Sequence, residues 1–475
     1  MTPAAAIATV LGYVALMFAI SFISSRGSDN LSFFRGTRRS SWLTVSVSMI
    51  SSVMSGVTFV SVPGWVGTSG MGYLQMCIGF AAGYAVIAYV LVPLYFRLDV
   101  VSVYQYLEQR FGLASYKTGA WFFFISKLLG SSVKLFIVCL SLQMLVFGPL
   151  GLPFALNAAS CTAIIFIYTL GSGVKSLIRT DLLRTFCMVA AVTLTIYFIA
   201  KKLDMNIVSA ITGSSMSRIF HFDDPLSGQY FWKQFLGGLF TVVAMTGLDQ
   251  DMMQHTLSCK SSRDSQKNLM TSIFFQIIVI FLFLCLGVLL HMFAQAEGID
   301  AKGDALFPAV ATGGYLPSIV GVLFILGLSA SSFGAGGSAL TALTTSFTVD
   351  IAGIEGKDES SVKRLRRRVH LSMALLMGIT VLVFSAVNST SAIDAIYCIA
   401  SYTYGPLLGL FAFGIATKKK VHDKFVPLVA LSAPAICYIL DHNSERWFGG
   451  YHFSYELLII NAAITILGLA LIIKR

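Results

Sequence analysis

The amino-acid sequence predicts an all-α membrane protein that crosses the bilayer many times. Hydrophobic residues make up 56% of its 475 residues and charged residues only 12%, whereas a typical soluble protein has about 25% charged residues. The mean hydropathy is +0.79, and apolar segments of the roughly 20 residues that span a bilayer as a helix follow one another along the chain. The lipid bilayer is therefore the expected environment, and we expect no nucleic-acid partner.

Thirteen segments are long and apolar enough to be predicted as membrane spans. They cover residues 4–23, 42–66, 73–96, 119–148, 153–171, 178–200, 231–249, 269–294, 315–349, 370–388, 392–416, 425–440 and 454–473. We do not expect the first span to be a signal peptide, because no basic segment precedes it and no small-residue cleavage motif follows it.

The distribution of basic residues predicts the orientation. With the N-terminus outside and the C-terminus inside, 24 of the 33 lysines and arginines fall in cytoplasmic segments and six in outer segments. Cytoplasmic loops of membrane proteins carry such an excess of positive charge. The net charge of +11 is thus an orientation signal, and the basic run 363–368 is expected at the inner lipid surface. We expect a monomer in the plasma membrane, as in a bacterial inner membrane.

The loops between the predicted spans are short. The longest are about 30 residues (201–230) and about 20 residues (295–314 and 350–369). An enzyme or a receptor usually carries a catalytic or sensory domain, and none of these loops could hold one. Transport is therefore the expected function, without an enzymatic activity.

Two spans are rich in residues that favour interrupted helices. The second contains six serines together with Ser55-Gly56, Thr58 and Pro63-Gly64, and the ninth contains the small residues of 329–341. Transporter sites lie where a helix unwinds at mid-bilayer. Close packing of small residues against neighbouring helices is the alternative for both spans.

Charged residues inside predicted spans indicate a functional pathway, because burying them in lipid is costly. Asp181 and Arg184 lie at i and i+3 on one face of the sixth span and could pair. Lys127 and Lys134 lie seven residues apart on one face of the fourth. Lys134 either pairs with Asp181 or contacts the substrate, and we include it among the candidate substrate-binding residues.

Five motifs together resemble the solute:sodium symporter family, which has the LeuT-type fold. They are Ser55-Gly-Val-Thr-Phe59 with Pro63-Gly64, Tyr168-Thr169 through Thr180-Asp181, Gly247-Leu-Asp-Gln-Asp-Met-Met-Gln254, Ser338 through Asp350, and Tyr402-Thr-Tyr-Gly-Pro406. The resemblance covers nearly the whole chain. The motifs also resemble those of the family branch that is common in Bacteroidetes-type bacteria.

The resemblance implies a fold of two inverted five-helix repeats. The first repeat would cover residues 41–200 and the second 228–417. One extra N-terminal helix would lie within 1–40, and two C-terminal helices within 418–475. This arrangement totals thirteen helices, which matches the number of spans counted independently from hydrophobicity.

The resemblance also implies site residues. Sodium would lie between the first and eighth core helices, where the backbone carbonyls of Ser51 and Met54 would bind it. Ser55, Thr58 and Gln75 would contact the substrate. In some members an acidic residue of the fifth core helix contributes to a second cation site, and the resemblance implies that Asp181 is the corresponding residue here. Beyond Na⁺, no cofactor is expected.

The chain departs from the family pattern in two facing helices. The family's pair of hydroxyl residues falls on Gly334 and Ala335, and an acidic position falls on Gly337, so that only Ser338 keeps a side-chain oxygen there. In the fifth core helix, the motif Trp-Thr-Asp-x-x-Gln becomes Arg179-Thr-Asp-Leu-Leu-Arg184. We hypothesise that Arg184, or Lys134, replaces the bound cation. Alternatively, a shift in register lets Ser331 and Ser332 supply the missing ligands.

The expected function is import of a small polar organic solute (a sugar, an acidic sugar or a carboxylate) by alternating access, with a degenerate sodium site. A proton-coupled or ion-independent transporter is the first alternative. A transporter-like solute sensor or scaffold is the alternative from another class of protein.

Overall fold

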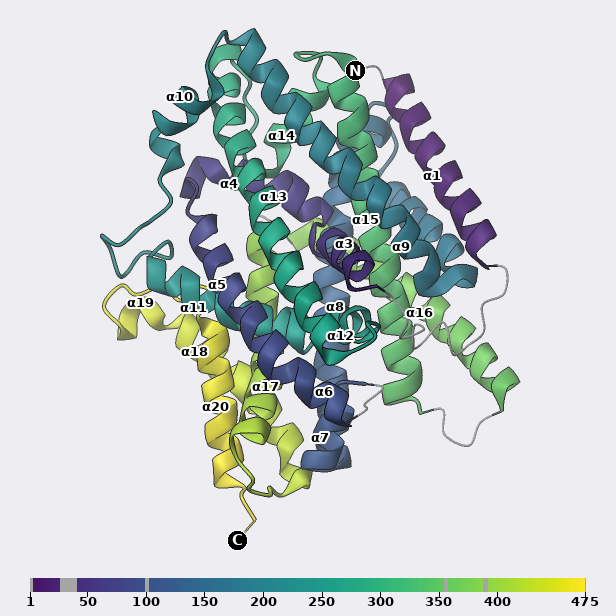
Figure 1. Cartoon of the computed structure of the whole chain (residues 1–475), viewed down its shortest axis with the longest axis vertical. Helices are drawn as coiled ribbons and strands as arrows, with labels where there is room; N and C mark the ends of the chain where they lie inside the picture. Colours follow the sequence, from purple (N-terminus) through teal and green to yellow (C-terminus); the bar gives the residue numbers. More distant parts are fainter. Residues whose placement is uncertain (1–2, 26–40, 99–101, 354–357, 388–391, 475) are drawn as a thin grey trace.

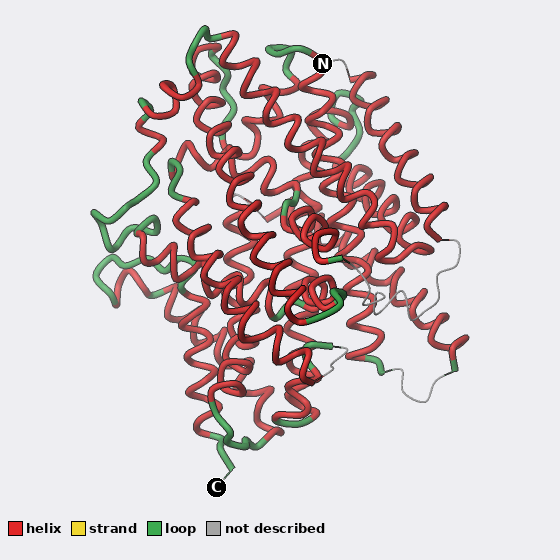
Figure 2. The backbone as a smooth tube through the Cα atoms, viewed as in Figure 1, coloured by secondary structure: helices red, strands yellow, loops and turns green. Residues whose placement is uncertain are grey.

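The computed structural model describes residues 3–25, 41–98, 102–353, 358–387 and 392–474. In these residues the regular structure is helical (Figure 2). The side chains of 51–53 and 171–183 lie outside this description, although their backbone belongs to helices. Two predicted site residues, Ser51 and Asp181, fall in these two stretches, so their side chains are outside the described part of the chain.

The helices are distributed along the whole chain (Figure 1). Their bounds are α1 Pro3–Ser25, α3 Trp42–Val53, α4 Gly56–Ser69, α5 Tyr73–Val86, α6 Val92–Leu98, α7 Gln105–Arg110, α8 Leu113–Leu142, α9 Phe154–Lys202, α10 Ile207–Thr212, α11 Phe231–Val242, α12 Gln250–Leu257, α13 Ser262–Glu297, α14 Leu306–Thr312, α15 Ser318–Ser346, α16 Glu359–Val387, α17 Ala392–Ala416, α18 Val426–His442, α19 Ser444–Trp447 and α20 Leu457–Leu471.

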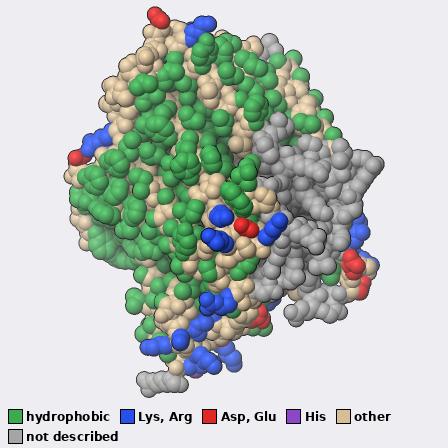
Figure 3. Space-filling model, in the orientation of Figure 1, with side chains coloured by type: hydrophobic (Ala, Val, Ile, Leu, Met, Phe, Trp, Pro, Cys, Tyr) green, Lys and Arg blue, Asp and Glu red, His purple; other side chains and the backbone are tan. Residues whose placement is uncertain are grey.

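Eight helices among the described residues are long and apolar enough to cross a membrane, and three shorter apolar helices accompany them, at Ala4–Ala19, Phe154–Leu170 and Leu457–Leu471. The chain is thus an all-helical membrane protein. The number of thirteen crossings and the orientation of the termini stay predictions. Figure 3 shows hydrophobic side chains over much of the visible surface, with lysine and arginine side chains gathered toward the end that holds the C-terminus.

The predicted interruption of the second span is confirmed. Helix α3 ends at Val53 and α4 begins at Gly56, and the two residues between them leave the helical conformation. Ser55 is extended, with φ −89° and ψ 170°. Pro63 and Gly64, which we expected to contribute to the break, lie inside α4 instead. The serine and glycine of Ser55-Gly56 therefore mark the break, and the proline does not.

Helix α9 differs from the sequence prediction. Spans 153–171 and 178–200 were predicted as two separate helices, but one helical segment runs through Phe154–Lys202. Its 49 residues correspond to roughly 74 Å of helix, more than twice the roughly 30 Å hydrocarbon core. The segment holds enough residues for both predicted spans. Its residues 171–177 contain two glycines and no proline, so the local sequence gives no strong signal to end a helix.

The helices that carry the candidate site pack around the broken helix. Helix α13 packs on α4 and α3, and α15 packs on α8, α9 and α4. Gly287 of α13 permits the close approach to α4, because a Cβ at this position would collide with the carbonyl of Pro63. The interruption at Met54 and Ser55 is thereby buried at the centre of the helix assembly, where both residues are at most 3% exposed.

Candidate functional site

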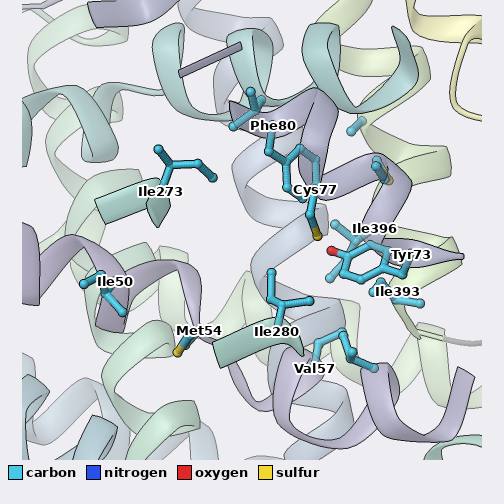
Figure 4. Packing of buried hydrophobic residues seen from close by; sticks show 14 of the residues in the cluster. Ile50, Met54, Val57, Tyr73, Cys77, Phe80, Ile273, Ile280, Ile393 and Ile396 are labelled. Atoms are coloured by element: carbon cyan, nitrogen blue, oxygen red, sulfur yellow. The ribbon is translucent and has the colours of Figure 1, made fainter. Parts of the chain in front are cut away.

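A cavity of about 130 Å³ lies beside the break between α3 and α4. We call this space the break cavity. Its lining includes Met54 and Ser55 at the break itself and Thr58 in the first turn of α4. Figure 4 shows Met54, Val57 and Ile280 near one another, with the hydroxyl of Tyr73 pointing into the same region. The structure thus brings together two of the predicted substrate residues, Ser55 and Thr58, next to an interrupted backbone.

Aromatic side chains form part of the wall of the break cavity. The hydroxyls of Tyr73 in α5 and Tyr397 in α17 are 2.7 Å apart and hydrogen-bonded. Trp65 packs edge-on against Tyr73, and Tyr455 lies against Tyr397. Tyr73 and Tyr397 therefore link helices from two parts of the chain that are more than 300 residues apart.

Gln75 lies apart from these residues. It is fully buried, and its amide nitrogen donates to the carbonyls of Gly72 and Gln229 at 3.3 and 3.0 Å. Its Oε1 accepts a hydrogen bond from the backbone nitrogen of His221. Gln75 does not line the break cavity; it holds the segment around 221–229 against the start of α5. The sequence identified a polar residue in an apolar helix but could not identify the loop that it binds.

A second cavity, of about 70 Å³, is rich in charged side chains, and we call it the ionic cavity. It is lined by Lys127 and Lys134 of α8, by Arg184 of α9, by Asp249 at the N-cap of α12 and by Asp251 in the first turn of α12. Gly334, Ala335 and Ser338 of α15 form its opposite wall. Lys134 also lines the break cavity, as do Met245, Met252 and Ile396. The two cavities are therefore neighbours, and Lys134 lies at their shared boundary.

Lys127 is held by two carboxylates in the ionic cavity. Its ammonium is 3.1 Å from Oδ2 of Asp249 and 3.0 Å from Oδ2 of Asp251. The hydroxyl of Ser338 donates to Asp251 at 3.0 Å, and that of Tyr404 donates to Asp249 at 3.1 Å. Charges removed from water need such compensation to be tolerated. These contacts join α8, α12, α15 and α17 in one buried polar network.

The carboxylates of this network lie at a second interruption. A π-helical turn at Val243–Gly247 ends α11, and α12 begins at Gln250. Asp249 is extended, and its side chain accepts hydrogen bonds from the backbone nitrogens of Asp251 and Met252. Aspartate is a preferred N-cap residue for this reason. The motif 247–254 was quoted in the resemblance without a role, so the sequence prediction missed Asp249 and Asp251 as site residues.

Arg184 reaches Gly334, the position at which the resemblance implies a hydroxyl residue. Its guanidinium fills the space that a Cβ on Gly334 would need, and the side chain is only 2% exposed. Similarly, the hydroxyl of Tyr168 fills the space next to Gly337 and donates to the carbonyl of Phe333 at 3.2 Å. Two side chains of α9 thus occupy the space beside Gly334 and Gly337 on α15.

Three hydroxyl residues of α15 near the two cavities have different hydrogen-bond partners. Ser331 donates to the carbonyl of Met54 at 3.2 Å, and Ser332 donates to the carbonyl of Leu328 within its own helix. Ser338 instead faces Asp251. An oxygen pair at Met54 and Ser331 is therefore present at the break, as the register-shift alternative requires. Ala335 and Gly334 offer only backbone and methyl groups to the ionic cavity.

The broken helices, the central cavities and the buried ion network define a membrane transporter. Residues 33–423 match the model of the sodium:solute symporter family. The chain therefore belongs to the sodium:solute symporter family.

The matches between the chain and its curated relatives cover different shares of the relatives' length. The chain is 23% identical to the sodium/sialic acid symporter of Proteus mirabilis over 97% of this chain and 93% of that protein. It is 26% identical to the human sodium-coupled monocarboxylate transporter 2 over 85% of this chain, and 23% identical to the human sodium/iodide cotransporter over 81%. The matched regions span 66% and 60% of those two human proteins.

Solved structures support the fold. A substrate-bound, outward-open sodium-coupled sialic acid symporter superimposes with a TM-score of 0.83 at 18% identity, covering 99% of both chains. A transporter of the nucleobase-cation-symport-1 family superimposes with a TM-score of 0.56 at 12% identity, covering 91% of this chain and 92% of the other. At these identities the likeness extends to the fold alone.

Proposed function

We propose that the protein is a secondary transporter that imports a small organic solute carrying a carboxylate, by alternating access between the two sides of a bacterial plasma membrane. The observation that carries the proposal is the position of Lys134 at the boundary of the two cavities. Among the described residues, it is the one charged residue that lines the break cavity. An ammonium beside the hydroxyls of Ser55 and Thr58 offers a carboxylate a charged partner and hydrogen-bond donors.

Two relatives support this class of solute. One is a sodium/sialic acid symporter and another a sodium-coupled monocarboxylate transporter, and both solutes carry a carboxylate. The other two cations of the ionic cavity serve different groups. Lys127 is bound to Asp249 and Asp251, and Arg184 lies against α15. Lys134 remains as the cation that faces the break cavity.

We further propose that Arg184 acts as a permanent cation in place of a transported sodium ion. Sodium in transporters of this architecture is bound by backbone carbonyls freed at helix breaks together with nearby oxygens. At this break, Met54 and Ser331 supply an oxygen pair, but Gly334 and Ala335 supply no side-chain oxygen. A guanidinium at Gly334 also repels a second cation, by a few kcal/mol at close range if the effective dielectric constant is near 20.

Uptake into proteoliposomes tests both parts of the proposal. Radiolabelled lactate, sialic acid and glucose are compared with an inward sodium gradient, with an inward proton gradient, and with neither. We expect uptake of a carboxylate solute down its own concentration gradient, without the need for a sodium gradient. Accumulation only under a sodium gradient would support ordinary symport, and solute binding without any uptake would support the sensor alternative.

A further inference from the structure

A groove of about 310 Å³ lies on the outer surface between α9 and α16, away from both cavities of the transport site. Its α9 wall contains Ala155, Ala159 and Ala163, and its α16 wall contains Leu371, Leu375 and Leu382. The groove exists because the side chains of α9 on this side are small, and the leucines of α16 form its other wall. Because the helices of this protein face lipid, the groove is open to the hydrocarbon interior of the membrane.

A row of arginines continues the α16 wall of the groove at its N-terminal end. Arg364 and Arg368 precede Leu371 by seven and three residues, a spacing that places all three on one face of a helix. Their side chains and that of Arg367 are exposed. None of the three guanidinium groups forms an ion pair with any residue that the structure describes.

Buried contacts fix the rotation of α16 relative to its neighbours. The ring of His370 lies between the hydroxyls of Thr169 in α9 and Thr344 in α15, at 2.9 and 2.8 Å. Farther along α16, Thr162 of α9 packs against Gly378. Both contacts involve the side of α16 that touches α9, so they hold the arginine row in line with the groove.

The dimensions of the groove suit one lipid chain. Leu371 and Leu382 are eleven residues apart, which corresponds to roughly 16 Å of helix. One leaflet contributes about half of the roughly 30 Å hydrocarbon core. A chain that enters beside Leu371 would therefore extend through one leaflet, with its headgroup at Arg364 and Arg368. Guanidinium groups bind phosphate oxygens through paired hydrogen bonds.

We propose that this groove is a binding site for an anionic phospholipid, with one acyl chain between α9 and α16 and the phosphate at Arg364 and Arg368. The charge of the arginine row favours this occupant over a second copy of the chain, which would bring another arginine row to the same place. The site is separate from the transport cavities, so it does not depend on the proposed solute or on ion coupling.

The test measures lipid retained by the full-length protein in mixed micelles, by native mass spectrometry. Phosphatidylglycerol and phosphatidylcholine with the same acyl chains are offered in equal amounts. We expect at least a threefold preference for phosphatidylglycerol, and a preference near one for the double variant R364Q/R368Q. The control K418Q/K419Q removes two exposed lysines that do not line this groove and should retain the preference. Glycerol 3-phosphate alone should not compete.

The double variant A159F/A163F tests the groove itself, and it remains informative if the arginine variant does not fold. Both alanines are exposed, so the aromatic rings can fill the groove without entering the core, and retained phosphatidylglycerol should fall at least threefold. Equal retention of the two lipids by the unmodified protein would overturn the proposal. The proposal would also be overturned if K418Q/K419Q lost the preference as fully as R364Q/R368Q, or if glycerol 3-phosphate competed as well as the lipid. A change in oligomeric state alone in A159F/A163F, with lipid retention unchanged, would overturn it too.

Discussion

The guanidinium of Arg184 occupies the space that a side chain on Gly334 would need, so a side chain at 334 and the present position of the guanidinium exclude each other. Arg184 belongs to α9 and Gly334 to α15, which pack against each other along their length. A side chain at 334 would require the end of the arginine side chain to move. In the proposed function, the absence of a hydroxyl at 334 and the fixed positive charge of Arg184 are therefore one coupled change.

This relationship predicts the behaviour of Gly334→Ser. The serine should displace the guanidinium of Arg184 and destabilise the protein by about 1 kcal/mol, the low end of the cost of overpacking, because the displaced atoms end a flexible side chain. Combined with Arg184→Ala, which makes room, the serine should cost much less. Thermal unfolding of both single variants and the double variant measures this coupling. If the stability loss of the double variant equals the sum of the losses of the two single variants, positions 184 and 334 are independent.

Arg184→Gln should destabilise the protein, because it removes a buried positive charge from the ionic cavity, which Asp249 and Asp251 also line. Removing one charge from a buried ionic network costs about 3–5 kcal/mol. Sodium chloride should restore part of the lost stability, since a sodium ion can then neutralise the site, whereas choline chloride should not. Differential scanning fluorimetry in the two salts measures the effect, and Arg184→Lys is the matched control. Equal stability of Arg184→Gln in both salts would argue against a cation position here.

Thr58→Val tests the break cavity. Thr58 lines the cavity and is half-buried, so valine should fit with little effect on folding. Loss of one hydrogen bond to the solute should weaken its binding about fivefold to tenfold, as measured by isothermal titration with the solute found in the uptake experiment. Thr193→Val, at an exposed threonine whose hydroxyl bonds only within α9, is the control. Unchanged affinity in Thr58→Val would remove Thr58 from the site.

Lys127 should be required for folding unless its carboxylate partners are also neutralised. Lys127→Met leaves Asp249 and Asp251 buried without their shared cation, at a cost of about 3–5 kcal/mol. The triple variant K127M/D249N/D251N should regain most of the lost melting temperature. If the triple variant is less stable than K127M alone, the network does not act as a unit.

The break at Met54-Ser55 could be predicted from local sequence, because serine and glycine within an apolar segment weaken a helix. The break before α12 carried a comparable signal, since Asp249 precedes a helix start and caps it, but span 231–249 was treated as uninterrupted. The partners of Lys127 lie more than 120 residues away in the chain, and helix periodicity does not reveal which helices meet.

The relation of Arg184 to α15 could be predicted in part. The sequence showed lost hydroxyls in one helix and added charge in another, and the resemblance placed these helices face to face. It could not show that the guanidinium reaches Gly334 itself, nor that Lys134 lies between two cavities. The resemblance implied a substrate contact for Gln75, and the sequence could not reveal its loop partner at 221–229. The similarity to a Bacteroidetes branch stays a prediction.

The central claim is that a fixed cation has replaced bound sodium, and the solute affinity of the unmodified protein in two salts tests it most directly. The solute identified by uptake is titrated into purified protein in 150 mM sodium chloride and in 150 mM choline chloride, about physiological ionic strength. The account predicts dissociation constants that differ by less than threefold, because Arg184 is present in both salts. An affinity more than tenfold higher in sodium, lost in Ser331→Ala, would contradict it and establish a working sodium site at Met54 and Ser331.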